Sequence, residues 1–246
     1  MALIIFLNQN VMSVNGFHLS HCCLFFKKKH LTLKVFIFYF SCAFVLVLAS
    51  KNTTPQVVSE QEIKNAIQTY GFLAGRRLQA WQQLVDENIK QPEEIKLKKV
   101  NDFFNEVRFI SDIEHWKKTD YWATPVEMLS TDAGDCEDYT IAKYFTLKAL
   151  GVSEKKLYLT YVKAIRLNQA HMVLTYFKTP QTIPLVLDNI NKRILKATQR
   201  SDLVPVYSFN GNGLWLAKQR GKGRSVSGGT KKLKAWNNLL ERLKPQ

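Results

Sequence analysis

The chain has 246 residues, a mass of 28.4 kDa and a formal net charge of +15, and 46% of its residues are hydrophobic. This length suits one substantial folded core, or one core with a small appendage. Lys and Arg are spread along predicted helices and the C-terminal tail, with no motif of a nucleic-acid-binding fold, so we expect no nucleic-acid partner. A basic surface also suits an acidic protein or a membrane.

The N-terminal segment 1–49 has the features of an export signal. A short lysine cluster precedes the apolar run Val35–Leu48, and Ala49 offers a small residue for cleavage. Roughly 14 apolar residues is short for a stable membrane span, although counting from Leu31 lengthens the run. We therefore predict a signal peptide and a periplasmic protein, with an inner-membrane anchor as the alternative and Met12 as an alternative start.

Export makes the cysteines informative. Cys22, Cys23 and Cys42 lie in the predicted signal, so Cys136 is the remaining cysteine of the predicted mature chain. A lone thiol in an oxidising compartment is a liability unless it is buried or takes part in chemistry. Acidic residues flank Cys136 on both sides, which weighs against a buried structural role.

Helical periodicity dominates the first half of the predicted domain. Apolar residues recur at three- and four-residue intervals over 57–90, and a second helix is expected to begin near Pro92. Together these elements predict a helical layer packed on a catalytic core. Residues 111–133 show no sustained period and are expected to form loops and turns. A further helix is predicted from Cys136 to about Leu150, with an acidic residue suited to its N-cap.

After this helix the period of the apolar residues changes from helical spacing to two, which predicts β-strands. Short connections favour antiparallel neighbours, so the predicted fold class is α+β with a mainly antiparallel sheet. We expect a catalytic domain over 50–220 and a basic, flexible tail over 221–246 that contains a short amphipathic helix. The predicted strands are 157–166, 171–177, 184–189, 203–209 and 213–218.

Three residues in this pattern suit nucleophilic catalysis. Cys136 lies in the first turn of its predicted helix, where unpaired N–H groups and the helix dipole favour a thiolate. His171 opens one strand and Asp188 ends the next, so the histidine can face the thiol with one ring nitrogen and the carboxylate with the other. A zinc site from the same residues is weaker, because paired ligand spacing is missing.

Four segments resemble the bacterial transglutaminase-like cysteine proteinases, the LapG-type periplasmic proteases: Asp-Tyr-Trp-Ala-Thr-Pro (120–125), Gly-Asp-Cys-Glu-Asp-Tyr (134–139), His-Met-Val-Leu (171–174) and Leu-Val-Leu-Asp-Asn (185–189). The resemblance covers roughly residues 57–218. It implies a papain-like, transglutaminase-like core in which the cysteine, histidine and aspartate named above form the catalytic triad.

The resemblance also implies calcium as a cofactor, with Asp135, Glu137 and Asp138 as candidate ligands. Oxygen ligands suit calcium, whose charge would offset the repulsion between these acids and a thiolate. The alternative is that the same acids cap the helix and pair with its dipole. Trp122 is expected near the nucleophile, where it either lines the oxyanion site or packs in the core.

By the same resemblance, the substrate is a very large surface adhesin, cut near its N-terminus beside a pair of alanines to release biofilm attachment. An inner-membrane cyclic-di-GMP receptor is implied as the partner that sequesters and inhibits the protease. Two alternatives stay open at this point. One is a transglutaminase-like acyltransferase that uses an amine in place of water, and the other is a non-enzymatic envelope scaffold.

Overall fold

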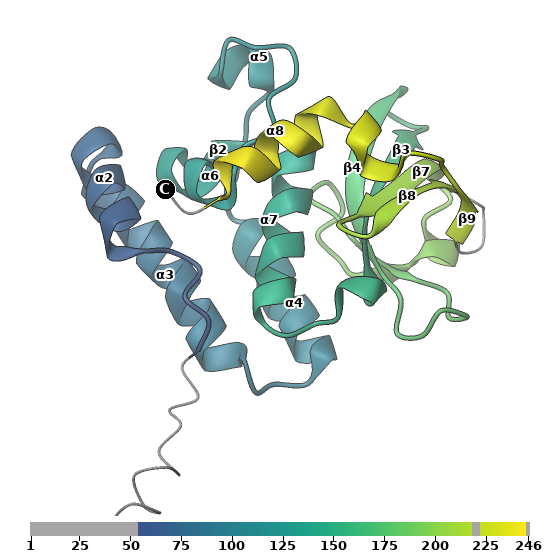
Figure 1. Ribbon diagram of the computed structural model, residues 1–246, viewed down its shortest axis with the longest axis horizontal. Helices are drawn as coiled ribbons and strands as arrows, with labels where there is room; N and C mark the ends of the chain where they lie inside the picture. Colours follow the sequence, from purple (N-terminus) through teal and green to yellow (C-terminus); the bar gives the residue numbers. More distant parts are fainter. Residues whose placement is uncertain (1–53, 218–221, 245–246) are drawn as a thin grey trace, which may run out of the picture. The chain divides into compact units, whose positions relative to one another are not determined.

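The computed structural model describes residues 54–217 and 222–244, in which a group of helices covers one side of an antiparallel sheet (Figure 1). These residues belong to one compact unit that begins at Thr53. The predicted signal at 1–49 lies outside the described residues. Among the described helices, none has the length and apolar character needed to cross a membrane.

The N-terminal helices form over the predicted region, with a break at Gly71. Ser59 and Glu62 make a reciprocal capping box at the start of the first helix. Gly71 has a φ of +86°, a conformation that glycine adopts without a Cβ penalty, and it separates the first two helices. The helices are α2 (Glu60–Tyr70), α3 (Phe72–Asn88) and α4 (Glu93–Phe104).

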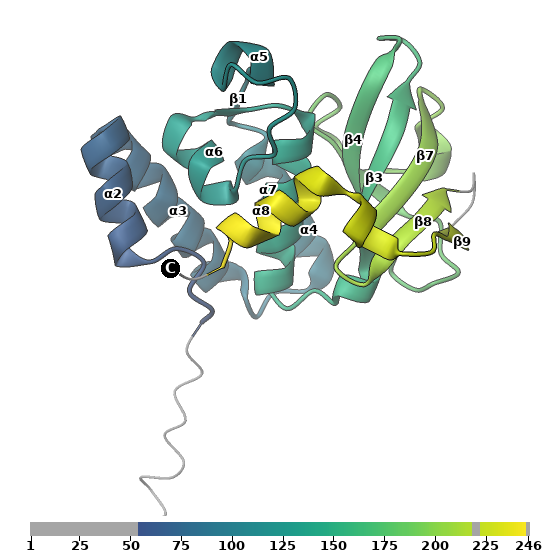
Figure 2. The same cartoon turned by 45° about the horizontal axis from the view of Figure 1, so that its top comes forward.

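A central helix, α7 (Cys136–Ala149), links the helical layer to the sheet, as both cartoon views show (Figures 1 and 2). Its buried side chains include Tyr144 and Leu147, both fully enclosed in the main core. The indole N–H of Trp81 in α3 donates to the Thr146 hydroxyl of α7 at 2.8 Å. This buried hydrogen bond fixes the helical layer against the helix that begins at the cysteine.

The sheet has seven described strands in the order β6-β5-β4-β3-β7-β8-β9, and every neighbouring pair is antiparallel. The predicted α+β class with a mainly antiparallel sheet is confirmed. β3 and β4 lie at the centre and pack against α7, so residues early in β4 lie close to the start of that helix. The strands are β3 (Leu157–Ala164), β4 (Gln169–Tyr176), β5 (Leu185–Leu187), β6 (Leu195–Lys196), β7 (Leu203–Asn210), β8 (Gly213–Ala217) and β9 (Lys222–Ser225).

The region 111–133 is more regular than its sequence period suggests. Thr124 and Glu127 form a capping box, and Pro125 occupies the first position of the helix that follows. These local signals outweigh the missing periodicity, so the expectation of loops alone was wrong here. The region contains α5 (Asp112–His115) and α6 (Pro125–Thr131), and a short parallel pair joins β1 (Arg108–Phe109) to β2 (Ala133–Gly134).

The C-terminal segment differs from the predicted flexible tail. β9 pairs with β8, and η3 (Gly229–Lys232) leads into α8 (Lys234–Arg242), which crosses the helical side of the unit (Figure 2). Trp236 and Leu239 of α8 are buried in the main core. The predicted amphipathic helix is therefore present, but it belongs to the compact unit because its apolar face covers core side chains.

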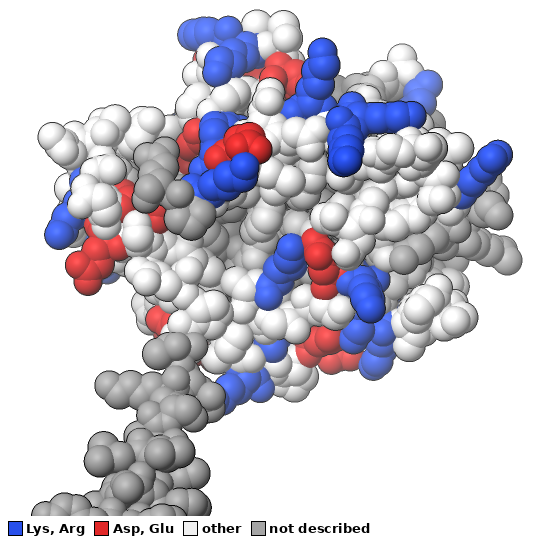
Figure 3. All heavy atoms as spheres, in the orientation of Figure 1, with Lys and Arg blue, Asp and Glu red and all other residues white. Residues whose placement is uncertain are grey.

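Basic residues on the face drawn in Figure 3 lie in separate groups over the helices and the sheet, with acidic side chains between several of them. Among the described residues, several exposed side chains form ion pairs, such as Lys178 with Glu94 at 3.0 Å. Part of the positive surface charge is thus paired locally. The absence of a nucleic-acid partner stays a prediction.

Candidate active site

Cys136 is the first residue of α7, as the sequence predicts. The Thr140 hydroxyl one turn later contacts the carbonyl oxygens of both Cys136 and Met172, at 2.9 and 3.1 Å. Met172 is the neighbour of His171 in β4. One side chain therefore fastens the first turn of the cysteine helix to the strand segment that carries the histidine.

His171 and Asp188 form a buried pair. His171 lies in β4 opposite Val162 of β3, and its side chain is 2% exposed. Its Nε2 atom is 2.8 Å from Asp188 Oδ1, and the aspartate follows β5, the neighbouring strand. With Nε2 engaged by the carboxylate, Nδ1 is the ring nitrogen left to exchange a proton with a reacting group.

Asp188 is held by further residues that the sequence gave no reason to single out. Arg200 Nη2 donates to its Oδ2 atom at 2.7 Å, and the Ile190 N–H donates to Oδ1 at 3.0 Å. Its backbone oxygen accepts hydrogen bonds from Asn105 Nδ2 at 3.0 Å and Lys143 Nζ at 3.1 Å. The carboxylate is therefore fixed through both its side chain and its main chain.

These contacts also set the charge of the site. Burial alone would raise the pKa of Asp188, but hydrogen bonds and charge from His171 and the Arg200 guanidinium hold it well below its usual value. Lys143 is buried, and burial lowers its pKa to about 7 although the charge of Asp188 opposes that shift. Asp188 is thus an anion that can orient His171 and stabilise positive charge on the ring.

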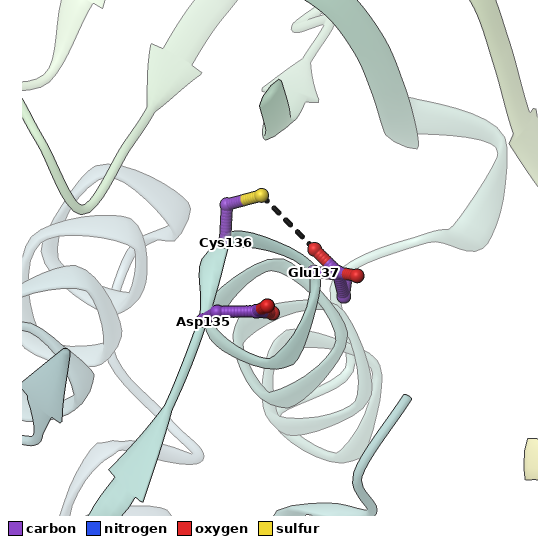
Figure 4. Close-up of side chains that lie close together, drawn as sticks. All are labelled: Asp135, Cys136 and Glu137. Atoms are coloured by element: carbon purple, nitrogen blue, oxygen red, sulfur yellow. Dashed lines mark hydrogen bonds between the residues drawn. The ribbon is translucent and has the colours of Figure 1, made fainter. Parts of the chain in front are cut away.

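The thiol faces acids. The Cys136 Sγ atom is 3.0 Å from Glu137 Oε2, and Asp135 lies at the same end of α7 (Figure 4). Burial raises the pKa of Cys136, and the charges of Glu137 and Asp135 raise it further. These effects oppose the stabilisation that the helix dipole gives to a thiolate. Positive charge near the acids would offset them.

The acidic cluster is larger than the three residues predicted from the sequence. Asp112 of α5 and Asp120 of the following connection join it, and two sets of carboxylate oxygens lie within 4.8 Å of one another. The oxygens in these sets come from Asp112, Asp120 and Glu137, and from Asp112, Asp135 and Asp138. Asp112 and Asp120 are distant from the cysteine in sequence and lie here because α5 and its connection fold over the start of α7.

Burial raises the pKa of several of these carboxyl groups. Burial and the charges of Glu137 and Asp138 raise the pKa of Asp135 to about 9, and burial raises that of Asp112 to about 6. Burial also raises the pKa of Asp138 well above its usual value. The Oδ1 atoms of Asp112 and Asp135 are buried without a hydrogen-bond partner among the described residues. Hard oxygen donors in this arrangement fit a calcium ion.

Asp138 has a second role at the helix start. It accepts hydrogen bonds from the Asp135 N–H at 3.2 Å and from the Ala123 N–H at 2.7 Å. The capping function predicted as the alternative is therefore present, and it is compatible with ligation by other oxygens of the cluster. The predicted ligand set itself stays a prediction.

The Trp122 side chain packs against β7 and donates a hydrogen bond to the acidic cluster. Its ring stacks on Phe209 of β7 at a centroid distance of 5.8 Å, and its indole N–H donates to Asp120 Oδ1 at 2.9 Å. This indole hydrogen is therefore not directed at a reacting carbonyl. Among the described residues, the oxygen and sulfur clusters suited to a metal do not combine Cys136 with His171 and Asp188, so the zinc alternative gains no support.

Comparison with known proteins finds one matching family and several similar structures. The family model described as bacterial transglutaminase-like cysteine proteinase BTLCP matches residues 78–216. The calcium-bound structure of Legionella pneumophila LapG is 44% identical, with a TM-score of 0.65, and covers 76% of this chain and 100% of its own. The EGTA-treated structure of the same protein is 43% identical, with a TM-score of 0.66, and covers 77% and 100%. A search of curated proteins found no match.

Proposed function

Because the chain belongs to the bacterial transglutaminase-like cysteine proteinases, and is therefore a cysteine protease, we propose that Cys136, His171 and Asp188 are its catalytic triad. The observation that carries the proposal is the buried 2.8 Å contact between His171 and Asp188, beside the helix that begins at the only cysteine among the described residues. A histidine held in this way has one nitrogen free for proton transfer.

In the proposed reaction, His171 removes the proton from the Cys136 thiol, and the sulfur attacks the scissile carbonyl carbon to give a tetrahedral oxyanion. The Cys136 N–H at the start of α7 is the proposed donor to that oxyanion. His171 then protonates the leaving amine as the thioester forms. Water, activated by the same histidine, hydrolyses the thioester and restores the thiol. Asp188 keeps the ring oriented and offsets its positive charge throughout.

We propose that the protease requires calcium. The support is two buried carboxylate oxygens of the acidic cluster, on Asp112 and Asp135, that have no hydrogen-bond partner among the described residues, together with the calcium-bound state of the Legionella relative. Asp135, Glu137 and Asp138, together with Asp112 and Asp120 from the same cluster, are the residues proposed to hold the ion. Bound there, calcium supplies the positive charge that lowers the cost of a thiolate at Cys136.

The proposed substrate is the N-terminal region of a very large surface adhesin, cleaved beside a pair of alanines in the periplasm to release biofilm attachment. The proposed inhibitor is an inner-membrane cyclic-di-GMP receptor that sequesters the protease. Both proposals rest on the family resemblance of the four sequence segments that contain the triad and the acids.

Incubation of the mature protein with N-terminal adhesin fragments from the same genome tests this function. Wild-type protein in calcium should yield two fragments, whereas Cys136→Ala should leave the substrate intact although its circular dichroism is unchanged. Transfer to EGTA should slow wild-type cleavage, and added calcium should restore it. Full cleavage by Cys136→Ala would exclude the proposed nucleophile, and equal rates with and without EGTA would exclude the calcium requirement.

A further inference from the structure

A C-terminal side chain is bonded to the segment that leads into α6. Arg242, the last residue of α8, donates from Nη1 to both carboxylate oxygens of Glu127, at 3.0 and 2.8 Å, and to the Tyr121 hydroxyl. Its Nη2 donates to the Trp122 carbonyl oxygen. The guanidinium carbon also lies 4.5 Å from the centre of the Tyr121 ring. One guanidinium therefore holds two residues of this segment, Tyr121 and Trp122, together with Glu127 of α6.

Residues 121–123 of the same segment each donate a hydrogen bond to the acidic cluster. The Tyr121 N–H donates to Asp112, the Trp122 indole N–H donates to Asp120, and the Ala123 N–H donates to Asp138. Three consecutive residues, 121–123, thus each donate a hydrogen bond to one acid of the cluster at the start of α7. A shift of this segment would disturb all three hydrogen bonds at once.

A second contact joins α8 to this segment. The buried Trp236 ring meets the Phe209 ring edge-on at 5.3 Å, and Phe209 stacks on Trp122 at 5.8 Å. Trp236 also stacks on Phe145 of α7 at 5.9 Å. The apolar contact fixes the position of α8, whereas the guanidinium supplies the directional hydrogen bonds. These two roles can be separated by substitution.

We infer that Arg242 is a positioning residue for the catalytic centre: it holds residues 121–123 so that the acids at the start of α7 keep the arrangement that binds calcium. This inference rests on the proposed calcium-dependent protease. It gives the C-terminal segment a function, which is to complete the active-site arrangement from outside the part matched by the family model.

Loss of the guanidinium should act mainly on this local arrangement. The Arg242 and Glu127 side chains are 31% and 30% exposed, so water can replace part of what is lost and the fold should persist. Residues that orient metal ligands typically change affinity or activity by about 10- to 100-fold when removed. Because Arg242 acts through the main chain of 121–123, we expect about a tenfold change, at the lower end of that range.

The test compares Arg242→Gln with Arg242→Lys, and with Lys244→Gln as a matched control. Lys244 lies two residues beyond Arg242 and pairs with the exposed Glu241, so its replacement removes one positive charge without touching 121–127. The full mature protein is used. Hydrogen exchange of peptides that cover 119–128 is measured without calcium, calcium affinity is measured by calorimetry, and alkylation of Cys136 by iodoacetamide is measured with calcium.

Arg242→Gln should speed exchange of the Ala123 region, weaken calcium binding and slow alkylation, each by about tenfold. Arg242→Lys should recover part of each change because it keeps the charge beside Glu127, and Lys244→Gln should match wild type. Unchanged exchange at 119–128 in Arg242→Gln would overturn the inference. So would a uniform rise in exchange over the whole unit, since that would indicate general destabilisation.

The exchange measurement needs neither calcium nor a substrate. If wild-type protein binds no calcium, the proposed function loses its cofactor, while exchange at 119–128 still decides whether Arg242 holds the segment. If wild-type protein binds calcium but Arg242→Gln binds it equally well, the positioning role is wrong and the calcium-dependent protease stands.

Discussion

The ion pair between Arg200 and Asp188 offers a quantitative test of how the proposed triad is held. The two side chains are 3% and 0% exposed, and their closest atoms are 2.7 Å apart. Removal of one partner of a buried pair typically costs about 3 to 5 kcal/mol. In Arg200→Gln, Asp188 keeps its contacts with His171 and the Ile190 N–H, so we expect the lower end, about 3 kcal/mol.

The assay is a double-mutant cycle of Arg200→Gln and Asp188→Asn, measured by urea unfolding at pH 7 without calcium. The cycle should give a coupling free energy of about 2 to 3 kcal/mol between the two side chains, at the upper end for residues in contact. Arg200 also pairs with Asp202, but that carboxylate is 31% exposed and the cycle removes its contribution. The exposed Arg166→Gln is the control and should change the unfolding free energy by less than about 0.5 kcal/mol.

The pH dependence has a defined sign. The folded pKa of Asp188 lies below its ordinary value of 3.8, so the stabilisation is fully present above about pH 4 and is lost as the pH falls through the folded pKa. Arg200→Gln raises that folded pKa, so the gap in unfolding free energy between wild type and variant should close below pH 4. A coupling below about 0.5 kcal/mol at pH 7 would refute the proposed role of Arg200.

Three further substitutions test the fold around the site. The folded pKa of Lys143 is about 7 against 10.5 in the unfolded chain, so the unfolding free energy of wild type minus that of Lys143→Met should increase from pH 7 to pH 10. A constant difference would contradict the lowered pKa of Lys143. Trp236→Ala should lower the unfolding free energy by about 3 to 5 kcal/mol because Trp236 is buried in the core. An unchanged unfolding free energy would instead support a flexible tail that does not pack on the core. Trp81→Phe should cost about 1 to 3 kcal/mol because Thr146 loses its buried donor, and circular dichroism melting checks it.

The sequence predicted those parts of the site that depend on local signals. Asp135 precedes an apolar helical period and Gly151 ends it, so the helix that begins at Cys136 could be placed within one residue. His171 and Asp188 fall in segments of period two, which predicted strands; His171 lies in β4, and Asp188 directly follows β5. The structure brings this histidine and aspartate together because those strands are antiparallel neighbours.

The residues that sequence reasoning missed depend on tertiary contacts. Asp112 and Asp120 lie in a region without period, and their approach to α7 comes from the fold of α5 and its connection. Arg200 is one basic residue among many until Asp188 is seen beside it. One signal was available for α6, since Thr124, Pro125 and Glu127 have the spacing of a capping box.

The segment 222–230 differs from the predicted flexible linker for another physical reason, whereas the predicted amphipathic helix is present. Gly, Ser and basic residues over 221–230 have the composition of a linker, but β9 lies there because β8 offers an open edge for pairing. Trp236 then inserts into a core that the helices and sheet leave uncovered. Composition alone does not reveal an edge or a gap that another part of the chain creates.

The mass of the products formed in ¹⁸O-labelled water tests the central claim most directly. Wild-type protein in calcium should convert an adhesin N-terminal fragment into two peptides, with one solvent oxygen at the new carboxyl terminus, and Cys136→Ala should yield neither. Labelled products from Cys136→Ala at the wild-type rate would contradict the account, as would an amine conjugate in place of the labelled carboxyl terminus.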